Sequence, residues 1–269
     1  MTSVVEHDER EAPALAHRER LLPFVGPHLA RREAGIKHPV HDFLFTYYSF
    51  RPAQLLRWTP GAAALPESRR LLVTTLLRLL RATAARPAHL SCFGLHEWAM
   101  VYRADETRHP QPLRLGGEAT DAVVTSHRIQ CSHFDAYRFF TPAAVGLNVL
   151  RPGRDDRADF EQPGCLHGTM DLYKHAFRLS GLIGSDLVAD CFELAWEVRI
   201  MDMRAAPYDL SGITLDPTGE PWTPVRIETA AGKQEYAAAQ RRFAERGTVL
   251  RQRLIGECER LLAAEASAG

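Results

Sequence analysis

Residues 185–205 read SDLVADCFELAWEVRIMDMRA, a segment whose apolar side chains recur at the spacing of an α-helix. One stripe of this helix would carry Leu187, Cys191, Leu194, Val198 and Met201. No other segment of the chain has so regular a pattern. The sequence therefore predicts its best-defined helix here.

Three further segments have helical periodicity, residues 14–32, 68–85 and 232–264. Pro23 and Pro27 interrupt the first, which predicts two short helices, since proline removes a helical hydrogen bond. Ser68 is a suitable cap for the second segment. The third is expected to form one long helix or a helix pair broken near Gly247.

Strand character is confined to residues 117–131, where Ala122, Val123 and Val124 follow a Gly-Gly turn signal. The chain has 269 residues, of which 45% are hydrophobic, and this is enough for one large core. We therefore expect a mainly α fold with a small β element around residues 117–131. It would form a single compact helical catalytic domain over residues 13–269, after a polar, disordered N-terminus over residues 1–12.

Composition limits the classes of partner. The 33 basic residues balance the 33 acidic ones, so no net charge attracts a polyanion. Five scattered cysteines do not form the paired framework of a secreted scaffold, and reduced thiols are expected. Neither a signal peptide nor an apolar run of membrane-spanning length is present in the sequence. These features predict a cytoplasmic protein with no membrane partner.

Histidines, carboxylates and aromatics concentrate in four segments, residues 38–52, 91–103, 126–142 and 165–177. In the second, His96 and Glu97 stand within an apolar stretch, where an unpaired ionisable group would be costly. A structural ion pair and a catalytic role both remain open for these two. The four segments are expected to converge on one active site.

Helical spacing connects several of these side chains. His38 and Asp42 would share a helical face at i and i+4, as would His167, Asp171 and His175 at i, i+4 and i+8. This spacing is acceptable for metal ligands. The segment 185–205 adds an acidic stripe that is expected to face solvent, except that Glu193 or Asp202 would face inward, near large apolar residues.

Several familiar sites are excluded by their missing motifs. Leu115-Gly116-Gly117 lacks the following lysine and helix of a phosphate-binding loop. The sequence has no Cys-x-x-Cys pair for a zinc finger and no Gly-x-Ser-x-Gly elbow of an α/β-hydrolase. A histidine- and carboxylate-rich site framed by aromatics remains.

From about His38 onward the chain resembles a family of bacterial proteins generally labelled 3-methyladenine DNA glycosylase. The resemblance lies in HDFLFTYYSFRPAQLLRW, CFGLHEWAMVYR, SHRIQCSHFDAYRFFTP, QPGCLHGTMDLYKHAF and VADCFELAWEVRIMDMRAAPYDL. It implies hydrolysis of the N-glycosidic bond of an alkylated purine in DNA. In that family an aromatic residue is usual at position 175 and a carboxylate can stand at 41, so His175 and His41 are set aside as ligands.

The resemblance also implies roles for individual residues. Glu97 or Asp135 would supply the catalytic carboxylate, with Lys174 beside them. Aromatic side chains would stack on the flipped base, namely Tyr47, Tyr48, Trp98, Tyr137 and Phe139. Arginines would hold phosphate, namely Arg51, Arg103, Arg128 and Arg138.

Two other functions remain open. A metal-dependent enzyme acting on a small molecule would bind a divalent ion such as iron, manganese or zinc. Its candidate ligands are His38, Asp42, His96, His127, His133, His167, Asp171 and Glu193. A non-catalytic protein that binds a nucleotide or another ligand would need only the aromatics and arginines.

Overall fold

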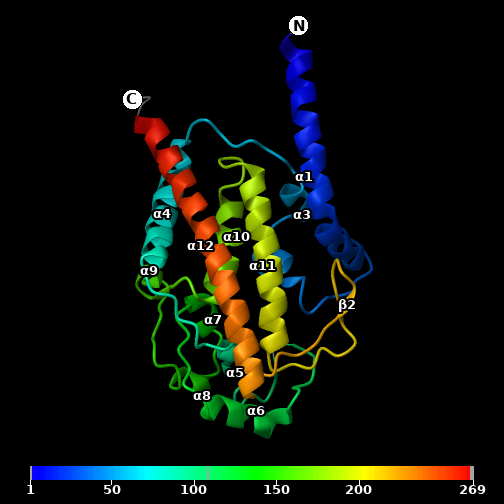
Figure 1. Cartoon of the computed structure of the whole chain (residues 1–269), viewed down its shortest axis with the longest axis vertical. Coiled ribbons are helices and arrows are strands. Elements are labelled where there is room, and N and C mark those ends of the chain that lie inside the picture. Colours follow the sequence, from blue (N-terminus) through cyan, green and yellow to red (C-terminus); the bar gives the residue numbers. More distant parts are fainter. Residues whose placement is uncertain (1, 108, 267–269) are drawn as a thin grey trace.

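The computed structural model describes residues 2–107 and 109–266, and over these residues the protein is mainly helical, which confirms the predicted fold class. The long helices run along the length of the molecule (Figure 1). They are α1 (Thr2–Glu33), α4 (Arg70–Ala84), α10 (Leu166–Arg178), α11 (Ser185–Ala205) and α12 (Ala230–Ala266).

Short elements connect the long helices. The first group is α2 (Phe43–Thr46), α3 (Pro52–Leu55) and the 3-10 turn η1 (Glu67–Arg69). The second is α5 (Leu95–Ala99), α6 (Gly116–Thr125), α7 (Phe134–Tyr137), α8 (Pro142–Val145) and α9 (Arg157–Phe160). Helices α5, α6 and α8 lie at the end of the molecule opposite both termini (Figure 1). Strands β1 (Thr214–Leu215) and β2 (Glu220–Pro221) pair antiparallel.

Helix α11 lies at the centre of the core and packs against α10 and α12. Its predicted apolar stripe is buried along its whole length, from Leu187 to Met201. Burying each leucine or valine of such a stripe contributes about 1.5–3 kcal/mol relative to its exposure. The prediction for residues 185–205 is thus confirmed in both its bounds and its buried face.

Helix α12 continues through Gly247, so of the two predicted alternatives the one long helix is observed and not the helix pair. A Cβ at this position would lie 3.1 Å from Cγ2 of Thr169 on α10. The glycine therefore allows two helices to approach closely, and their packing offsets its weak helix propensity of about 1 kcal/mol. A glycine stands at position 247 because α12 packs closely on α10 there, and not because the chain turns.

Helix α1 is likewise continuous, although Pro23 and Pro27 lie inside it. The helix bends in its C-terminal part (Figure 1), as internal prolines favour. Leu21 and Val25 are fully buried there, so tertiary packing maintains the helix across the lost hydrogen bonds. The backbone of residues 2–12 is helical where the sequence predicted disorder, because extending an existing helix costs far less than starting one.

The predicted β element around residues 117–131 is wrong. Residues Gly116–Thr125 form helix α6, which buries Thr120, Val123 and Val124. This i, i+3, i+4 spacing fits a helix, and the adjacent valines misled because β-branched residues favour strands. An isolated bridge between Ile129 and Asn148 is the strand-like pairing observed near this segment. No helix within the described residues is long and apolar enough to span a bilayer.

Candidate metal centre

Four ionisable side chains meet in the interior, at the junction of three helices. His96 and Glu97 come from α5, His167 from α10 and Asp202 from α11. One potential ligand atom of each lies within 4.8 Å of those of the other three. Their exposed fractions are 5%, 6%, 8% and 0%, respectively. We refer to these four residues as the centre.

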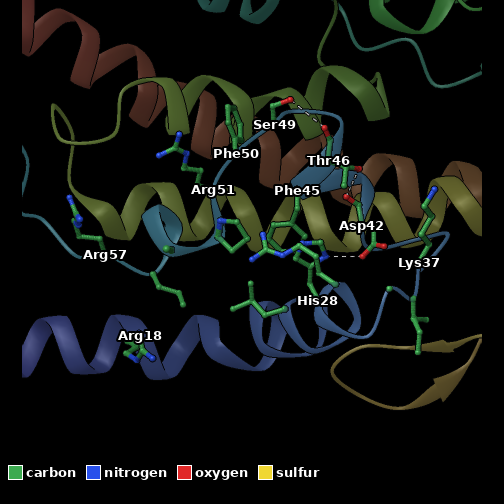
Figure 2. A pocket seen from close by; sticks show the side chains of 17 residues that line it. Arg18, His28, Lys37, Asp42, Phe45, Thr46, Ser49, Phe50, Arg51 and Arg57 are labelled. Carbon is green, nitrogen blue, oxygen red and sulfur yellow. Dashed lines mark hydrogen bonds and ion pairs between the residues drawn. The ribbon is translucent and has the colours of Figure 1, made fainter.

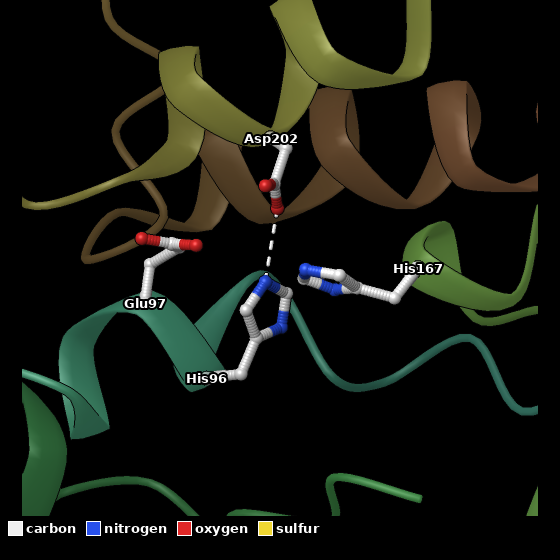
Figure 3. Close-up of side chains that lie close together, drawn as sticks. All are labelled: His96, Glu97, His167 and Asp202. Carbon is white, nitrogen blue, oxygen red and sulfur yellow. Dashed lines mark hydrogen bonds and ion pairs between the residues drawn. The ribbon is translucent and has the colours of Figure 1, made fainter. Parts of the chain in front are cut away.

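Helix α5 is fixed against the end of α11 by two features of its sequence. Gly94 precedes it with φ of 70°, and a Cβ there would lie 3.3 Å from Cβ of Ala205. The indole Nε1 of Trp98 donates a hydrogen bond of 2.9 Å to the carbonyl oxygen of Ala205. These contacts hold His96 and Glu97 next to Asp202 (Figure 3).

His96 and Asp202 form the best-defined pair of the centre. Nε2 of His96 lies 2.9 Å from Oδ1 of Asp202, and Nη1 of Arg199 donates to Oδ2 at 3.0 Å. Burial alone would lower the pKa of His96, but the carboxylate of Asp202 raises it above its usual value. Burial would raise the pKa of Asp202, yet His96 holds it well below its usual range. Both shifts favour the ionised form of the pair.

His167 contrasts with this pair. Burial, followed by the nearby His96, lowers its pKa to about 3, so the imidazole is neutral and keeps a lone pair. Its buried Nδ1 has no hydrogen-bond partner among the residues that the structure describes. Glu97 and His167 approach the His96–Asp202 pair from opposite sides (Figure 3). An imidazole in this state is ready to coordinate a cation.

A second polar group adjoins the centre around Asp171. Oδ1 of Asp171 accepts a hydrogen bond of 2.9 Å from the hydroxyl of Tyr48. Its Oδ2 accepts from Arg157 at 2.9 Å and from Lys174 at 3.1 Å, and lies 3.3 Å from Nε2 of His133. Burial would raise the pKa of Asp171, but Lys174 and His133 hold it well below its usual range.

This group continues to the surface through Asp135. Nζ of Lys174 donates to Oδ2 of Asp135 at 2.9 Å, and Nε of Arg138 lies 3.1 Å from Oδ1. Arg138 also donates to the hydroxyl of Tyr47 at 2.9 Å. Burial would lower the pKa of Lys174, but Asp171 raises it, so the amine is an ammonium ion and not a nucleophile.

Residues 91–103, 126–142 and 165–177 therefore converge, and residues 38–52 contribute Tyr47 and Tyr48. Two predicted metal ligands from residues 38–52 lie elsewhere. Nε2 of His38 lies 2.9 Å from the carbonyl oxygen of Thr214, and Asp42 accepts from His28 at 2.8 Å. Helix α2 begins after Asp42, so the expected shared helical face does not exist.

His38 also belongs to a second cluster, with His41 and Asp216, whose ligand atoms are close enough for a metal. Both ring nitrogens of His38 are engaged by the backbone, because Nδ1 accepts from the amide of His41 at 3.2 Å. Nε2 of His41 accepts from the amide of Asp216 at 2.9 Å. These imidazoles join two loops and are not available as ligands without breaking those bonds.

Glu193 and His127 lie apart from the centre as well. Glu193 pairs with Arg20 at 2.7 Å on the partly exposed side of α11. Nδ1 of His127 lies 2.6 Å from the carbonyl oxygen of Val123 at the end of α6. Of the two α11 carboxylates that would face inward, it is Asp202 that does so.

Only some of the residues expected to bind a DNA substrate lie together near Asp135. Trp98 is fully buried with its indole nitrogen engaged, so its ring cannot stack on a base. Phe139 lies with Tyr47 and Arg138, whereas Tyr137 packs on Phe140. The remaining predicted arginines are exposed and lie on separate segments, at Arg51, Arg103 and Arg128.

Sequence reasoning missed several members of these groups. Asp202 was considered for an inward position but not as a ligand, although it stands between two methionines in IMDMR. Arg157, Glu161 and Arg199 were not anticipated at all. Nε of Arg157 pairs with Oε1 of Glu161 at 2.5 Å, and both lie beside Asp171 and His133. Arg157 and Glu161 are four residues apart, and Arg199 is three residues from Asp202. Such spacing is compatible with pairing on a helix, but it does not show that these pairs lie beside side chains distant in sequence.

Comparisons with known proteins found no matching family model, no similar curated protein and no similar solved structure. The resemblance to the glycosylase-labelled family stays a prediction. Function must therefore be inferred from the arrangement of the residues themselves.

Proposed function

We propose that this protein is a metal-dependent enzyme that acts on a small molecule, with its metal held by His96, Glu97, His167 and Asp202. The observation that carries the proposal is the convergence of these four buried donors, from three helices, within 4.8 Å of one another. Bundle interiors commonly build metal sites in this way, from side chains on facing helices.

The donor set suits a divalent transition metal. Two imidazoles and two carboxylates match the preferences of Fe(II), Mn(II) and Zn(II). A cation that replaced the proton of His96 would lie beside the carboxylates of Glu97 and Asp202. Arg199 engages Oδ2 of Asp202, so Oδ1 is the oxygen that faces His96 and the centre.

A purely structural role explains only half of the centre. The ion pair of His96 with Asp202, backed by Arg199, is complete without His167. His167 lies beside this ion pair as a buried imidazole whose lowered pKa of about 3 keeps it neutral, and the ion pair itself gives it no role. Metal coordination gives this imidazole a partner.

The surroundings indicate the type of chemistry. A bound divalent ion would act as a Lewis acid that lowers the pKa of bound water or polarises a substrate oxygen. Burial of all four donors favours a small substrate that enters the interior. Next to the centre, His133 stacks on His167 with ring centroids 5.4 Å apart, and it connects the centre to the carboxylate of Asp171.

Metal titration of two matched variants tests the proposal. His167 and His175 are both buried on α10, both have an unpartnered Nδ1 among the described residues, and burial lowers the pKa of each to about 3. Wild-type protein should bind about one equivalent of Fe(II), Mn(II) or Zn(II). His167→Leu should lower the affinity about 100-fold, whereas His175→Leu should not. Absence of binding, or equal binding by both variants, would overturn the proposal.

A second candidate is base excision from alkylated DNA, and it is favoured by the surface group at Asp135. Burial would raise the pKa of Asp135, but Lys174 lowers it, so a carboxylate is available there. The guanidinium of Arg138 lies 4.2 Å from the ring centroid of Phe139, beside Tyr47. An aromatic surface with a carboxylate and a cation suits a flipped base.

Release of 3-methyladenine from alkylated duplex DNA tests this second candidate. Asp135→Asn should abolish the release, whereas His167→Leu and a chelator should leave it unchanged. No release by the wild-type protein would defeat base excision and leave the metal proposal intact.

A further inference from the structure

A cavity of about 1240 Å³ lies between α1 and the chain segment that carries α2 and α3 (Figure 2). Five cationic side chains line it, namely Arg18, Arg32, Lys37, Arg51 and Arg57. Arg18, Arg51 and Arg57 lie at one end and Lys37 at the other (Figure 2). None of the four residues of the centre lines this cavity, so it is a separate feature of the molecule.

The cationic side chains of the cavity outnumber the carboxylates in its lining. Asp42 is the one carboxylate among its lining residues, and it already accepts hydrogen bonds from His28 and from the amide of His38. Within the described part of the chain, none of the five cations forms an ion pair. Arginines elsewhere are commonly paired, as Arg114 is with Glu228 and Arg246 with Glu197. An unpaired group of cations around a concave surface attracts an anion.

Apolar side chains form the wall between these cations. Phe45 is buried and stacks on His28 with ring centroids 4.2 Å apart, and Phe50 stacks on Phe177 at 4.0 Å. Leu29 and Leu56 add aliphatic surface. Both rings are held by the core, so this wall exists before any ligand arrives. A ligand that fills the cavity must therefore contact apolar surface as well as cations.

We propose that this cavity binds a small amphipathic organic anion, an oxyanion group joined to an aromatic or aliphatic body. Four of the five cations are arginines, whose planar guanidinium groups bind phosphate and carboxylate through paired hydrogen bonds. The volume exceeds that of a typical drug-sized pocket of about 300–1,000 Å³. It has room for such a ligand together with water.

Calorimetric titration with four probes tests this inference. 1-Naphthyl phosphate and 2-naphthoate carry both an aromatic body and an oxyanion, whereas inorganic phosphate lacks the body and 2-naphthol lacks the charge. At an ionic strength of about 50 mM, one or both of the amphipathic anions should bind with one site per chain. Affinity should exceed that of the other two probes by about tenfold or more. The stronger of the two identifies the oxyanion as phosphate or carboxylate.

Variants of exposed residues keep the test independent of folding. Arg51→Gln and Arg57→Gln should each weaken binding by about five- to tenfold. Ile36→Ser, which changes an exposed apolar lining residue, should weaken the naphthyl probes but not inorganic phosphate. Arg242→Gln, an exposed arginine on α12, is the control and should change nothing. Equal binding of 2-naphthol, equal binding of inorganic phosphate, or indifference to Arg51 and Arg57 would overturn the inference.

Discussion

The imidazole rings of His133 and His167 stack with centroids 5.4 Å apart and planes inclined by 28°. His167 belongs to the centre, and Nε2 of His133 lies 3.3 Å from Asp171. This contact places a group that reaches the surface, through Lys174 and Asp135, directly beside four buried donors. The proposed metal thus lies next to side chains that can orient a substrate or exchange a proton.

Loss of the Asp202 carboxylate should destabilise the metal-free protein strongly. Asp202→Asn leaves His96 and Arg199 buried without their counter-charge, and breaking a buried pair costs about 3–5 kcal/mol. Urea unfolding in the presence of a chelator measures this loss. Glu193→Gln on the same helix is the control, because its partly exposed pair with Arg20 contributes about 1 kcal/mol or less. Equal effects of the two variants would contradict the charge assignment.

Metal affinity should depend on pH through His96. Coordination requires a neutral imidazole, and Asp202 raises the pKa of His96 above 6.5. The metal must therefore displace a proton below that raised pKa, and affinity should fall about tenfold for each unit of pH below it. His167, with a pKa of about 3, adds no dependence in this range. Titrations between about pH 6 and 9 test this, and a flat profile would exclude His96 as a ligand.

The free energy of unfolding of the metal-free protein should fall as the pH rises, whereas the metal affinity should rise. Because the folded pKa of His96 is raised, its ion pair with Asp202 contributes fully below the unfolded pKa of about 6.5. That contribution is lost as the pH rises through the folded pKa. Urea unfolding with a chelator should show a decline above neutral pH, which His96→Gln should abolish. An equal decline in the His96→Gln variant would show that the titration of another group causes it.

Two glycines of α12 should respond oppositely to alanine. Gly247→Ala places a Cβ 3.1 Å from Thr169 and should destabilise the protein by about 1 kcal/mol or more through overpacking. Gly256 has no such neighbour within 4 Å, so Gly256→Ala should stabilise by about 0.5–1 kcal/mol through helix propensity. Thermal unfolding of both variants measures the difference. Stabilisation by both would show that α12 does not approach α10 closely at Gly247.

The sequence predicts those features of the fold that depend on local periodicity. Helix α11 was predicted correctly because its apolar stripe repeats without interruption. Helix α6 was not, because two adjacent valines indicate a strand when only a short window is considered. The prolines of α1 were interpreted as breaks, and a break near Gly247 was one of two alternatives, since the partners that pack against these helices lie far away in sequence.

In the candidate site, too, the sequence predicts residues that a local pattern identifies and misses those that depend on packing. His96 and Glu97 were chosen because ionisable groups in an apolar segment need partners, and His167 because of its helical spacing with Asp171. The first three lie in the centre, whereas Asp171 lies in the adjoining polar group. Glu193 was chosen as a ligand in place of Asp202. The two residues are nine positions apart, which is about two and a half helical turns, so they point to opposite sides of α11. Only the packing of α11 against α5 and α10 determines which side is the interior.

An anomalous-diffraction map of protein reconstituted with Mn(II) or Zn(II) tests the central claim most directly. We predict a peak between His96, Glu97, His167 and Asp202, about 2.0–2.3 Å from at least one imidazole nitrogen and one carboxylate oxygen. A fully reconstituted crystal with no peak there, or with its peak at His38, His41 and Asp216, would contradict a metal centre at the junction of α5, α10 and α11.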